Sequence, residues 1–178
     1  MNNKITVIIP FYNEEKTIAK TIKKLLSQTL KPAEIIFINS NSTDSSDDII
    51  NIYKKKNKII KTFSLQTLYP SDSKNLGIQL ASNSLLAFMD CDLNFTKDWL
   101  KSQLALLIKN NLDLVLGSCQ LKGINDFDRA SVFNTYGYDN NNSCVPGTLV
   151  KKSVFIKTGF FLQARSFYDV LWKDKIFK

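Results

Sequence analysis

Two aspartates, Asp90 and Asp92, have the type and spacing best suited to chemistry in this sequence. They flank Cys91 and directly follow Leu85–Met89, an apolar run of the length of a buried strand. Two carboxylates one residue apart at the end of a strand can both reach a common point. Mg²⁺ commonly takes one or two protein carboxylates and completes its shell with waters and substrate phosphates, and Mn²⁺ also suits carboxylate oxygens. The pair therefore predicts a divalent cation and a phosphate-bearing substrate.

Missing residue types narrow the chemistry further. The 178 residues include no histidine, which excludes Ser-His and Cys-His triads, histidine zinc ligands and histidine acid/base chemistry. No glycine-rich loop of the GxGxxG or GxxxxGK[ST] kind follows an apolar run, which argues against a dinucleotide enzyme and a P-loop NTPase. Carboxylates are left as bases, and phosphate recognition is left to a metal ion and to cations.

The bulk composition is that of one globular domain spanning residues 1–178, with 44% hydrophobic and 22% charged residues. Lys and Arg number 24 against 16 Asp and Glu, and the net charge of +8 favours anionic partners such as a phosphorylated substrate or an anionic membrane face. The lysines are scattered and are not interleaved with aromatic residues as on a nucleic-acid platform. We therefore predict no nucleic-acid partner.

The cysteines and the lengths of the apolar runs indicate in which cellular compartment the protein is expected. Cys91, Cys119 and Cys144 are odd in number and lack CxxC spacing, so neither a disulfide framework nor a zinc site is expected. The first apolar run is too short for a signal peptide, and no run approaches the length of a membrane span. We expect reduced thiols in a soluble, cytoplasmic protein, whose charge is compatible with peripheral association at the inner membrane face.

Short apolar runs alternate with segments of helical period, which predicts the α/β class with a mostly parallel central sheet and helices on both faces. The predicted strands are Ile5–Ile9 (ended by Pro10), Ile35–Ile38, Ile59–Phe63 (nearer an edge), Leu85–Met89 (central) and Leu112–Leu116. The predicted helices include one capped by Asn13 with Glu14 and Glu15 in its first turn, one from Ser71 or Asp72 with Leu76 and Leu80 inward, and one from about Lys97.

The last third of the chain is less regular. Lys122–Ser143 is rich in Asn and Asp and has no period, which predicts a long excursion; we hypothesise that it is a lid. Order returns with Gly147–Val150, a short helix around Val154 and an amphipathic segment from Asp169 to Phe177.

Polar residues gather where three predicted strands end, at Phe11–Glu14, Asn39–Asp44 and Asp90–Asp92. Ligands of open α/β sheets bind in the crevice beyond the carboxyl ends of the strands. The three clusters are therefore expected to form one site.

Six segments in the same order and spacing resemble the large family of inverting glycosyltransferases with the GT-A fold, often called family two. Ile5–Glu15 (ITVIIPFYNEE) resembles the opening of that family, and Ile38–Asp44 (INSNSTD) resembles its strand end followed by DDGSTD. Ser73–Gly77 with Ala81 resembles its [RK]NxGxxxA helix, and Phe88–Asp92 resembles its FxDxD. Gly147–Phe161 resembles its GxxxxxRxxFxxxGGF segment, and Tyr168–Trp172 resembles its ED-x-x-W segment, so that the resemblance covers nearly the whole chain.

The resemblance implies a GT-A (Rossmann-like) enzyme of the kind that serves cell-envelope polysaccharide biosynthesis. It would move a sugar from a nucleotide-diphosphate donor, with a UDP-sugar favoured, to a saccharide, lipid-linked or protein acceptor. Asp92 with Asp90 would hold Mn²⁺ or Mg²⁺, and Asp169 would be the base. The nucleotide site would comprise Pro10, Phe11, Tyr12, Glu14, Asn39, Asn41, Lys74, Asp90 and Cys91. Residues 1–118 would be the nucleotide-sugar-binding half, and residues 119–178 the acceptor, lid and catalytic-base half.

The chain departs from the family pattern at two places. Asn39 stands where Asp is usual, with Ser40 and Asn41 in place of a further Asp and Gly, which leaves the choice of nucleotide open. Tyr168 stands where Glu is common beside the base. A degenerate or truncated module that binds nucleotide-sugars without turnover is therefore an alternative. A sugar-nucleotide nucleotidyltransferase is a weaker one, because it should carry a glycine-rich loop after the first strand. The sequence leaves the oligomeric state open.

Overall fold

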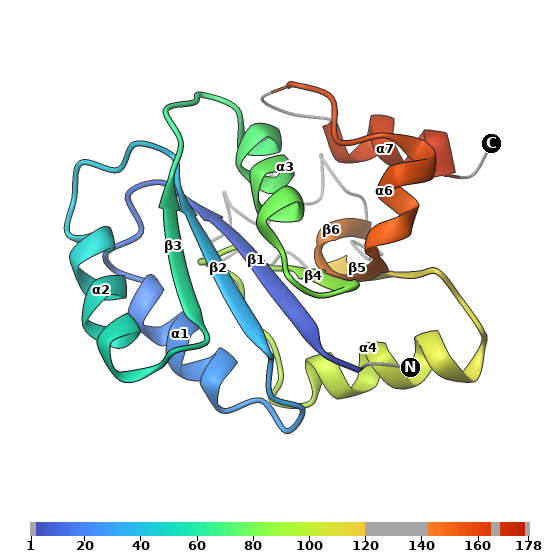
Figure 1. The fold of residues 1–178 in the computed structure, drawn as a ribbon, viewed down its shortest axis with the longest axis horizontal. Coiled ribbons are helices and arrows are strands. Elements are labelled where there is room, and N and C mark those ends of the chain that lie inside the picture. Colours follow the sequence, from blue (N-terminus) through green and yellow to red (C-terminus); the bar gives the residue numbers. More distant parts are fainter. Residues whose placement is uncertain (1–2, 120–141, 165–167, 177–178) are drawn as a thin grey trace, which may run out of the picture.

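The protein folds as one six-stranded sheet with helices on both faces (Figure 1). The computed structural model describes residues 3–119, 142–164 and 168–176. The strands are β1 (Ile5–Phe11), β2 (Glu34–Asn39), β3 (Ile60–Ser64), β4 (Leu85–Phe88), β5 (Leu114–Cys119) and β6 (Asn142–Lys151). The helices are α1 (Ile18–Leu26), α2 (Ser46–Lys56), α3 (Pro70–Leu80), α4 (Trp99–Lys109), α6 (Lys152–Thr158) and α7 (Tyr168–Ile176).

The strand order is β3-β2-β1-β4-β6-β5. Strands β3, β2, β1 and β4 are parallel, and β6 runs antiparallel to both β4 and β5. The α/β class, the central position of β4 and the edge position of β3 are confirmed. The hypothesised lid, Lys122–Ser143, falls almost entirely outside the described residues. None of the described helices has the length and apolar character needed to span a bilayer.

Alternation along β1 divides the apolar side chains between two cores. Ile5, Val7 and Ile9 face α1, α2 and α4, where they pack in one buried cluster. Ile8 faces α3, α6 and α7 and belongs to a second cluster, which contains Trp172. Because successive strand residues point to opposite faces, continuous apolar runs such as this one serve both layers of helices.

Strand β1 continues past the residue expected to end it. Pro10 pairs with Ile38 of β2 inside the strand, which ends at Phe11. The Met89 N–H donates to the Ile8 carbonyl on the β4 side, so Pro10, two residues further, also directs its nitrogen to that side. The last β1–β4 pair is Ile8 with Phe88, and the missing N–H of Pro10 therefore costs no ladder hydrogen bond.

Helix α3 follows the prediction at Leu76 but not at Leu80. Leu76 is partly buried and packs against the second core, whereas Leu80 is exposed and Gly77 and Ile78 are buried. A Cβ added at Gly77 would lie 2.3 Å from Cγ2 of Ile8, so α3 approaches β1 as closely as a glycine allows. The spacing of apolar residues predicted Leu80 because it contains no information about this contact between α3 and β1.

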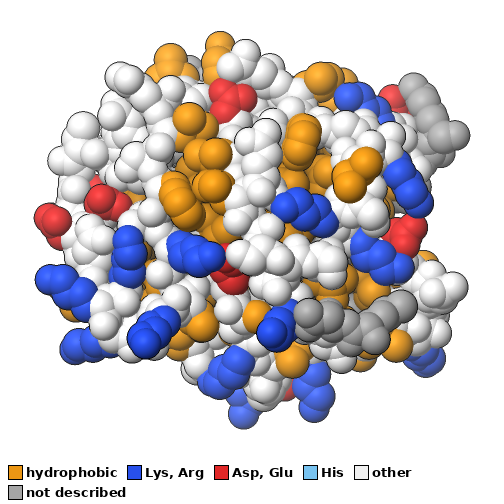
Figure 2. Space-filling model, in the orientation of Figure 1, with side chains coloured by type: hydrophobic (Ala, Val, Ile, Leu, Met, Phe, Trp, Pro, Cys, Tyr) orange, Lys and Arg blue, Asp and Glu red, His pale blue; other side chains and the backbone are white. Residues whose placement is uncertain are grey.

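Basic side chains are spread over the visible face of the molecule (Figure 2). On the face shown in Figure 2, Lys and Arg side chains lie in separate places among uncharged ones and do not form a single stripe. This distribution agrees with the scattered lysines of the sequence.

Candidate active site

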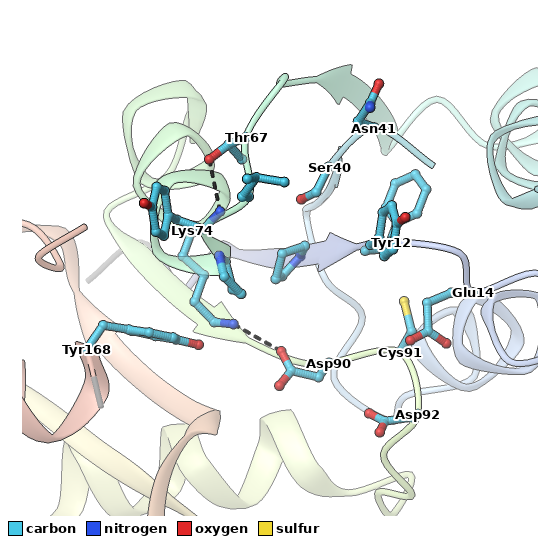
Figure 3. Close-up of a pocket in the computed structure, with 15 residues that line it drawn as sticks. Tyr12, Glu14, Ser40, Asn41, Thr67, Lys74, Asp90, Cys91, Asp92 and Tyr168 are labelled. Atoms are coloured by element: carbon cyan, nitrogen blue, oxygen red, sulfur yellow. Dashed lines mark hydrogen bonds and ion pairs between the residues drawn. The ribbon is translucent and has the colours of Figure 1, made fainter. Parts of the chain in front are cut away.

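A cavity of about 490 Å³ opens where β1, β2 and β4 end (Figure 3). Its wall is formed by Pro10, Phe11, Tyr12, Glu14, Ser40, Asn41, Thr67, Leu68, Tyr69, Pro70, Lys74, Asp90, Cys91, Asp92 and Tyr168. The three polar clusters predicted from the sequence therefore each contribute to one cavity, at the edge of the sheet where ligands of open α/β folds bind.

The loops after β1 and β2 are held together by Asn13. Its Oδ1 accepts from the Thr43 N–H at 2.8 Å, and its own N–H donates to Ser42 Oγ at 3.0 Å. Asn13 has φ 55, in the left-handed region that Asn tolerates better than most residues. The prediction that Asn13 caps a helix is wrong: α1 begins only at Ile18, and Glu14 and Glu15 precede its first turn. The cap prediction considered only local partners, whereas the side chain bonds a neighbouring loop.

Asn39 and Asn41 have different surroundings. Asn39 is buried and its Oδ1 accepts from the Ser42 N–H at 2.7 Å, so this side chain shapes the loop and is not part of the cavity wall. Asn41 lies on the wall with φ 67. The family pattern has glycine at this position, and a left-handed backbone is what glycine and asparagine share.

A buried ion pair joins α3 to the end of β4. The side chain of Lys74 is 1% exposed, and its Nζ lies 3.1 Å from Oδ1 of Asp90. Burial by itself would lower the pKa of Lys74, but the Asp90 carboxylate and the Tyr168 side chain raise it above its ordinary value. The Lys74 ammonium also lies 5.5 Å from the centroid of the Tyr168 ring. Lys74 is thus a fixed positive charge in the wall, almost completely shielded from water.

The segment Asp90–Asp92 is anchored to helix α1. Thr21 Oγ1 of α1 donates to the Cys91 carbonyl at 2.6 Å. The Cys91 side chain is buried, and burial together with the neighbouring carboxylates raises the pKa of its thiol, so it stays protonated. Asp92 is exposed at the cavity wall.

The donor set suits a hard cation that also binds a substrate. The carboxylates of Glu14, Asp90 and Asp92 lie on the wall, and among the described residues no group of three His, Cys, Asp or Glu could hold a metal alone. Mg²⁺ commonly binds through one or two carboxylates and fills its remaining positions with water and phosphate oxygens. The residues present therefore fit Mn²⁺ or Mg²⁺ bound together with a diphosphate.

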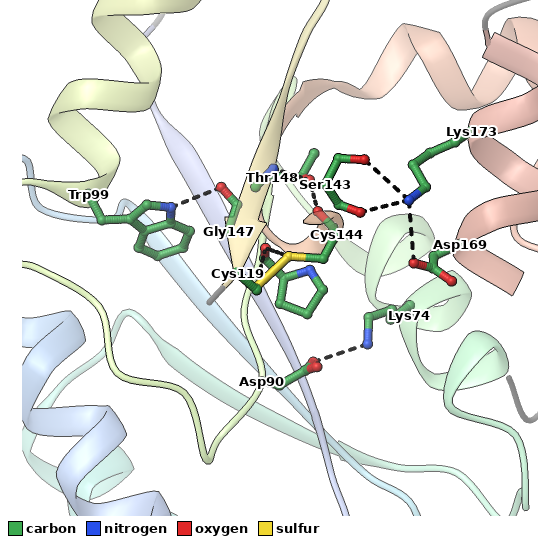
Figure 4. The surroundings of a disulfide bond; sticks show 12 residues. Lys74, Asp90, Trp99, Cys119, Ser143, Cys144, Gly147, Thr148, Asp169 and Lys173 are labelled. Carbon is green, nitrogen blue, oxygen red and sulfur yellow. Dashed lines mark hydrogen bonds and ion pairs between the residues drawn. A yellow bond between two sulfur atoms is a disulfide. The ribbon is translucent and has the colours of Figure 1, made fainter. Parts of the chain in front are cut away.

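Asp169 lies beside the cavity but not on its wall. It is in the first turn of α7, directly after Tyr168, which does line the cavity. Its Oδ2 lies 3.8 Å from Nζ of Lys173, which donates to the Ser143 carbonyl at 2.7 Å (Figure 4). The ion pair lies within α7, and the Lys173–Ser143 hydrogen bond ties this helix to the start of β6.

Sequence reasoning did not identify the loop between β3 and α3 as part of the site. Thr67 to Pro70 line the cavity, and Tyr69 is partly exposed. This loop has no periodic pattern and no charge. Its one available signal was position, because it follows a parallel strand and therefore starts at the same edge of the sheet.

The expectation of three reduced cysteines is wrong in this structure. Cys119 and Cys144 form a disulfide between β5 and β6, and Cys91 is free and buried (Figure 4). Gly117 pairs with Cys144, and Cys119 pairs with Asn142, so the two cysteines are diagonal neighbours. Their Cα atoms are 6.3 Å apart, within the range that a disulfide can bridge. Their sequence separation of 25 residues conceals a proximity that only the strand register creates.

Comparison with known proteins gives a consistent result. A glycosyltransferase of Rickettsia conorii is 40% identical over 110 residues, which are 62% of this chain and 18% of that protein. A poly(ribitol-phosphate) beta-glucosyltransferase of Bacillus spizizenii is 35% identical over 126 residues, covering 68% of this chain and 20% of that protein. The chain thus spans about a fifth of the length of these two relatives.

The fold is shared with S. aureus TarS, whose residues 1–349 have been crystallised in complex with UDP-GlcNAc. The TM-score is 0.74 at 23% identity, over 97% of this chain and 52% of that one. This chain therefore has the GT-A architecture expected from the sequence. The family model described as glycosyl transferase family 2 matches residues 6–171. Because that match covers most of the chain, the protein belongs to glycosyl transferase family 2.

Proposed function

We propose that this chain binds a nucleotide-diphosphate sugar, with a UDP-sugar favoured, and transfers the sugar to an acceptor hydroxyl with inversion. The observation that carries the proposal is the composition of the cavity. It places the exposed ring of Tyr12 and the amide of Asn41 in the same wall as the carboxylates of Asp90 and Asp92. An aromatic face and an amide suit a base, and carboxylates suit a cation on a diphosphate. The UDP-GlcNAc bound by TarS supports the choice of donor.

The fixed charges of the wall assign different tasks to the two aspartates. Asp90 is paired with buried Lys74, so its carboxylate is oriented and is suited to a ribose contact. Asp92 is exposed on the cavity wall and is the proposed ligand for Mn²⁺ or Mg²⁺. When bound, the cation would supply positive charge at the diphosphate as the sugar leaves it. Lys74 lines the cavity beside Asp90 and would orient that carboxylate and add positive charge next to the donor.

In the proposed reaction, the acceptor oxygen attacks the anomeric carbon from the face opposite the diphosphate. The bond between the anomeric carbon and the phosphate oxygen breaks, and the nucleoside diphosphate departs with that electron pair. The Asp169 carboxylate accepts the proton of the acceptor hydroxyl. Attack from the opposite face inverts the configuration at the anomeric carbon.

The acceptor classes proposed are a saccharide, a lipid-linked sugar or a protein. The net charge of +8 supports peripheral association with an anionic membrane face. A module that binds the donor without turnover is the second candidate. It is favoured by one observation: the Asp169 carboxylate is paired with Lys173 and does not line the cavity.

The test is UDP binding in the presence of Mn²⁺, measured by calorimetry on the parent and on Asp92→Asn. The change removes one carboxylate charge and is expected to weaken binding about tenfold or more. Asp48→Asn is the matched control, because Asp48 is exposed on α2 and does not line the cavity. Equal UDP affinity for the parent and Asp92→Asn in Mn²⁺ would show that the metal assignment is wrong.

A further inference from the structure

A second groove, of about 780 Å³, meets the donor cavity at Asp92, which lines both. Its other walls come from the segment between Met89 and Thr96, from the first two turns of α4, and from the facing parts of β5 and β6. We propose that this groove binds the acceptor and that the acceptor is a neutral saccharide chain. The inference rests on the proposed function, because that proposal places the diphosphate at Asp92.

The position of the groove suits an acceptor. The bond to be broken joins the sugar to the diphosphate, so the attacking hydroxyl must arrive beside the group held at Asp92. A groove that begins at Asp92 and runs along α4, away from Tyr12 and Asn41, leads to this point from outside the nucleotide site. Donor and acceptor can then be bound at the same time without competing for one space.

The charged residues that line the groove indicate which class of acceptor it suits. Of the described residues that line it, Asp92 alone is charged, and none is Lys or Arg. A phosphate-bearing polymer or a lipid phosphate would meet a carboxylate and no cation there, whereas phosphates are usually bound by Arg, Lys or backbone N–H groups. Lys24 does not line the groove, and its ammonium donates to Asn94 Oδ1 and lies 5.4 Å from the centroid of the Phe95 ring.

The remaining side chains suit a ligand rich in hydroxyl groups. Asn94, Ser102 and Gln103 line the groove and offer amide and hydroxyl groups, which can both donate and accept hydrogen bonds. Phe95 and Trp99 add two aromatic rings with centroids 5.3 Å apart. Trp99 Nε1 donates to the Gly147 carbonyl at 2.9 Å, which fixes this ring between α4 and β6. Fixed rings and uncharged polar groups together match the apolar faces and hydroxyls of a sugar.

The experiment measures acceptor binding without nucleotide. Malto-, cello- and chito-oligosaccharides serve as neutral probes and poly(ribitol phosphate) as the anionic probe, with dissociation constants from calorimetry on the full chain. Ser102→Arg places a long cationic side chain on the groove wall from an exposed position of α4. Ser153→Arg makes the same change at an exposed position of α6 and is the control. UDP binding in Mn²⁺ is measured for all three proteins.

We expect at least one neutral oligosaccharide to bind the parent and Ser153→Arg equally. Ser102→Arg should weaken this binding by about tenfold or more and leave UDP affinity within about twofold. The inference is overturned if no neutral chain binds, if poly(ribitol phosphate) binds the parent more tightly, or if Ser102→Arg leaves saccharide affinity unchanged. If the parent does not bind UDP in Mn²⁺, the proposed donor is refuted instead. Saccharide binding is measured without nucleotide, so its result does not depend on that outcome.

Discussion

The Lys74 ammonium lies 3.1 Å from the Asp90 carboxylate, and the two partners differ sharply in exposure, at 1% and 35% of their side chains. Water can therefore reach one charge of the pair but not the other. The loop after β4 thus receives its orientation from a lysine on α3 that is almost completely shielded from water. A pair of this kind should respond differently according to which partner is removed.

The first prediction follows from this difference. Asp90→Ala leaves an ammonium buried without a countercharge and is expected to lower the free energy of unfolding by about 3–5 kcal/mol. Lys74→Met leaves a carboxylate that water can solvate, so its cost should be about 1–2 kcal/mol. Urea denaturation of both variants gives the two values. A larger loss for Lys74→Met than for Asp90→Ala would contradict this account of the pair.

A second prediction concerns Glu34, the first residue of β2, at the end of the sheet opposite the cavity. Burial by itself would raise the pKa of its carboxyl, but Lys61, Thr6 and Ser82 bond the carboxylate and lower the pKa to about 2. Since the folded pKa lies below the unfolded one, the stabilisation is complete above about pH 5 and is lost as the pH falls toward 2. A shift of this size corresponds to about 3 kcal/mol.

The measurement for Glu34 is the free energy of unfolding between pH 2 and pH 7. Glu34→Gln should be less stable than the parent at pH 7, and the difference should shrink as the solution is acidified. Asp48→Asn, at an exposed position of α2, should keep the acid dependence of the parent. A Glu34→Gln variant whose deficit stays constant from pH 7 to pH 2 would exclude the proposed linkage.

Local pattern was sufficient for most of the framework. The apolar runs identified β1, β2 and β4 because a strand covered by helices on both faces buries nearly all of its side chains and is therefore apolar throughout. The end-of-strand rule brought Tyr12, Asn41 and Asp92 to one cavity for the same reason. These inferences needed only the chain direction and the class of the sheet.

Features that depend on contacts between distant segments could not be predicted. Asn13 has the composition of a helix cap, yet it bonds Thr43, a residue of another loop. Leu80 has helical spacing, yet it is exposed, and Gly77 makes the close contact with Ile8. The division of 1–118 from 119–178 stays a prediction.

A third prediction concerns the thiols. In the denatured chain without reductant, one maleimide should be incorporated, at Cys91, because Cys119 and Cys144 are bonded to each other. Reduction before labelling should raise the number to three. In the native protein Cys91 should react slowly, because it is buried and the pKa of its thiol is raised. Mass spectrometry counts the labels, and three labels without reductant would show that the disulfide does not form in solution.

The last prediction separates catalysis from binding at Asp169. An asparagine at this position keeps the size of the side chain and an oxygen that can face Lys173, so the fold and UDP affinity should be retained within about twofold. An amide cannot accept the proton of an attacking hydroxyl, so transfer should fall by about 10²–10⁴-fold. Asp174→Asn, an exposed position on the same helix, controls for loss of charge and should keep the parent rate. Transfer rates with a UDP-sugar and a neutral oligosaccharide give the comparison. Unchanged transfer by Asp169→Asn would remove it as the base, whereas absent transfer by a parent that binds UDP would favour the non-catalytic module.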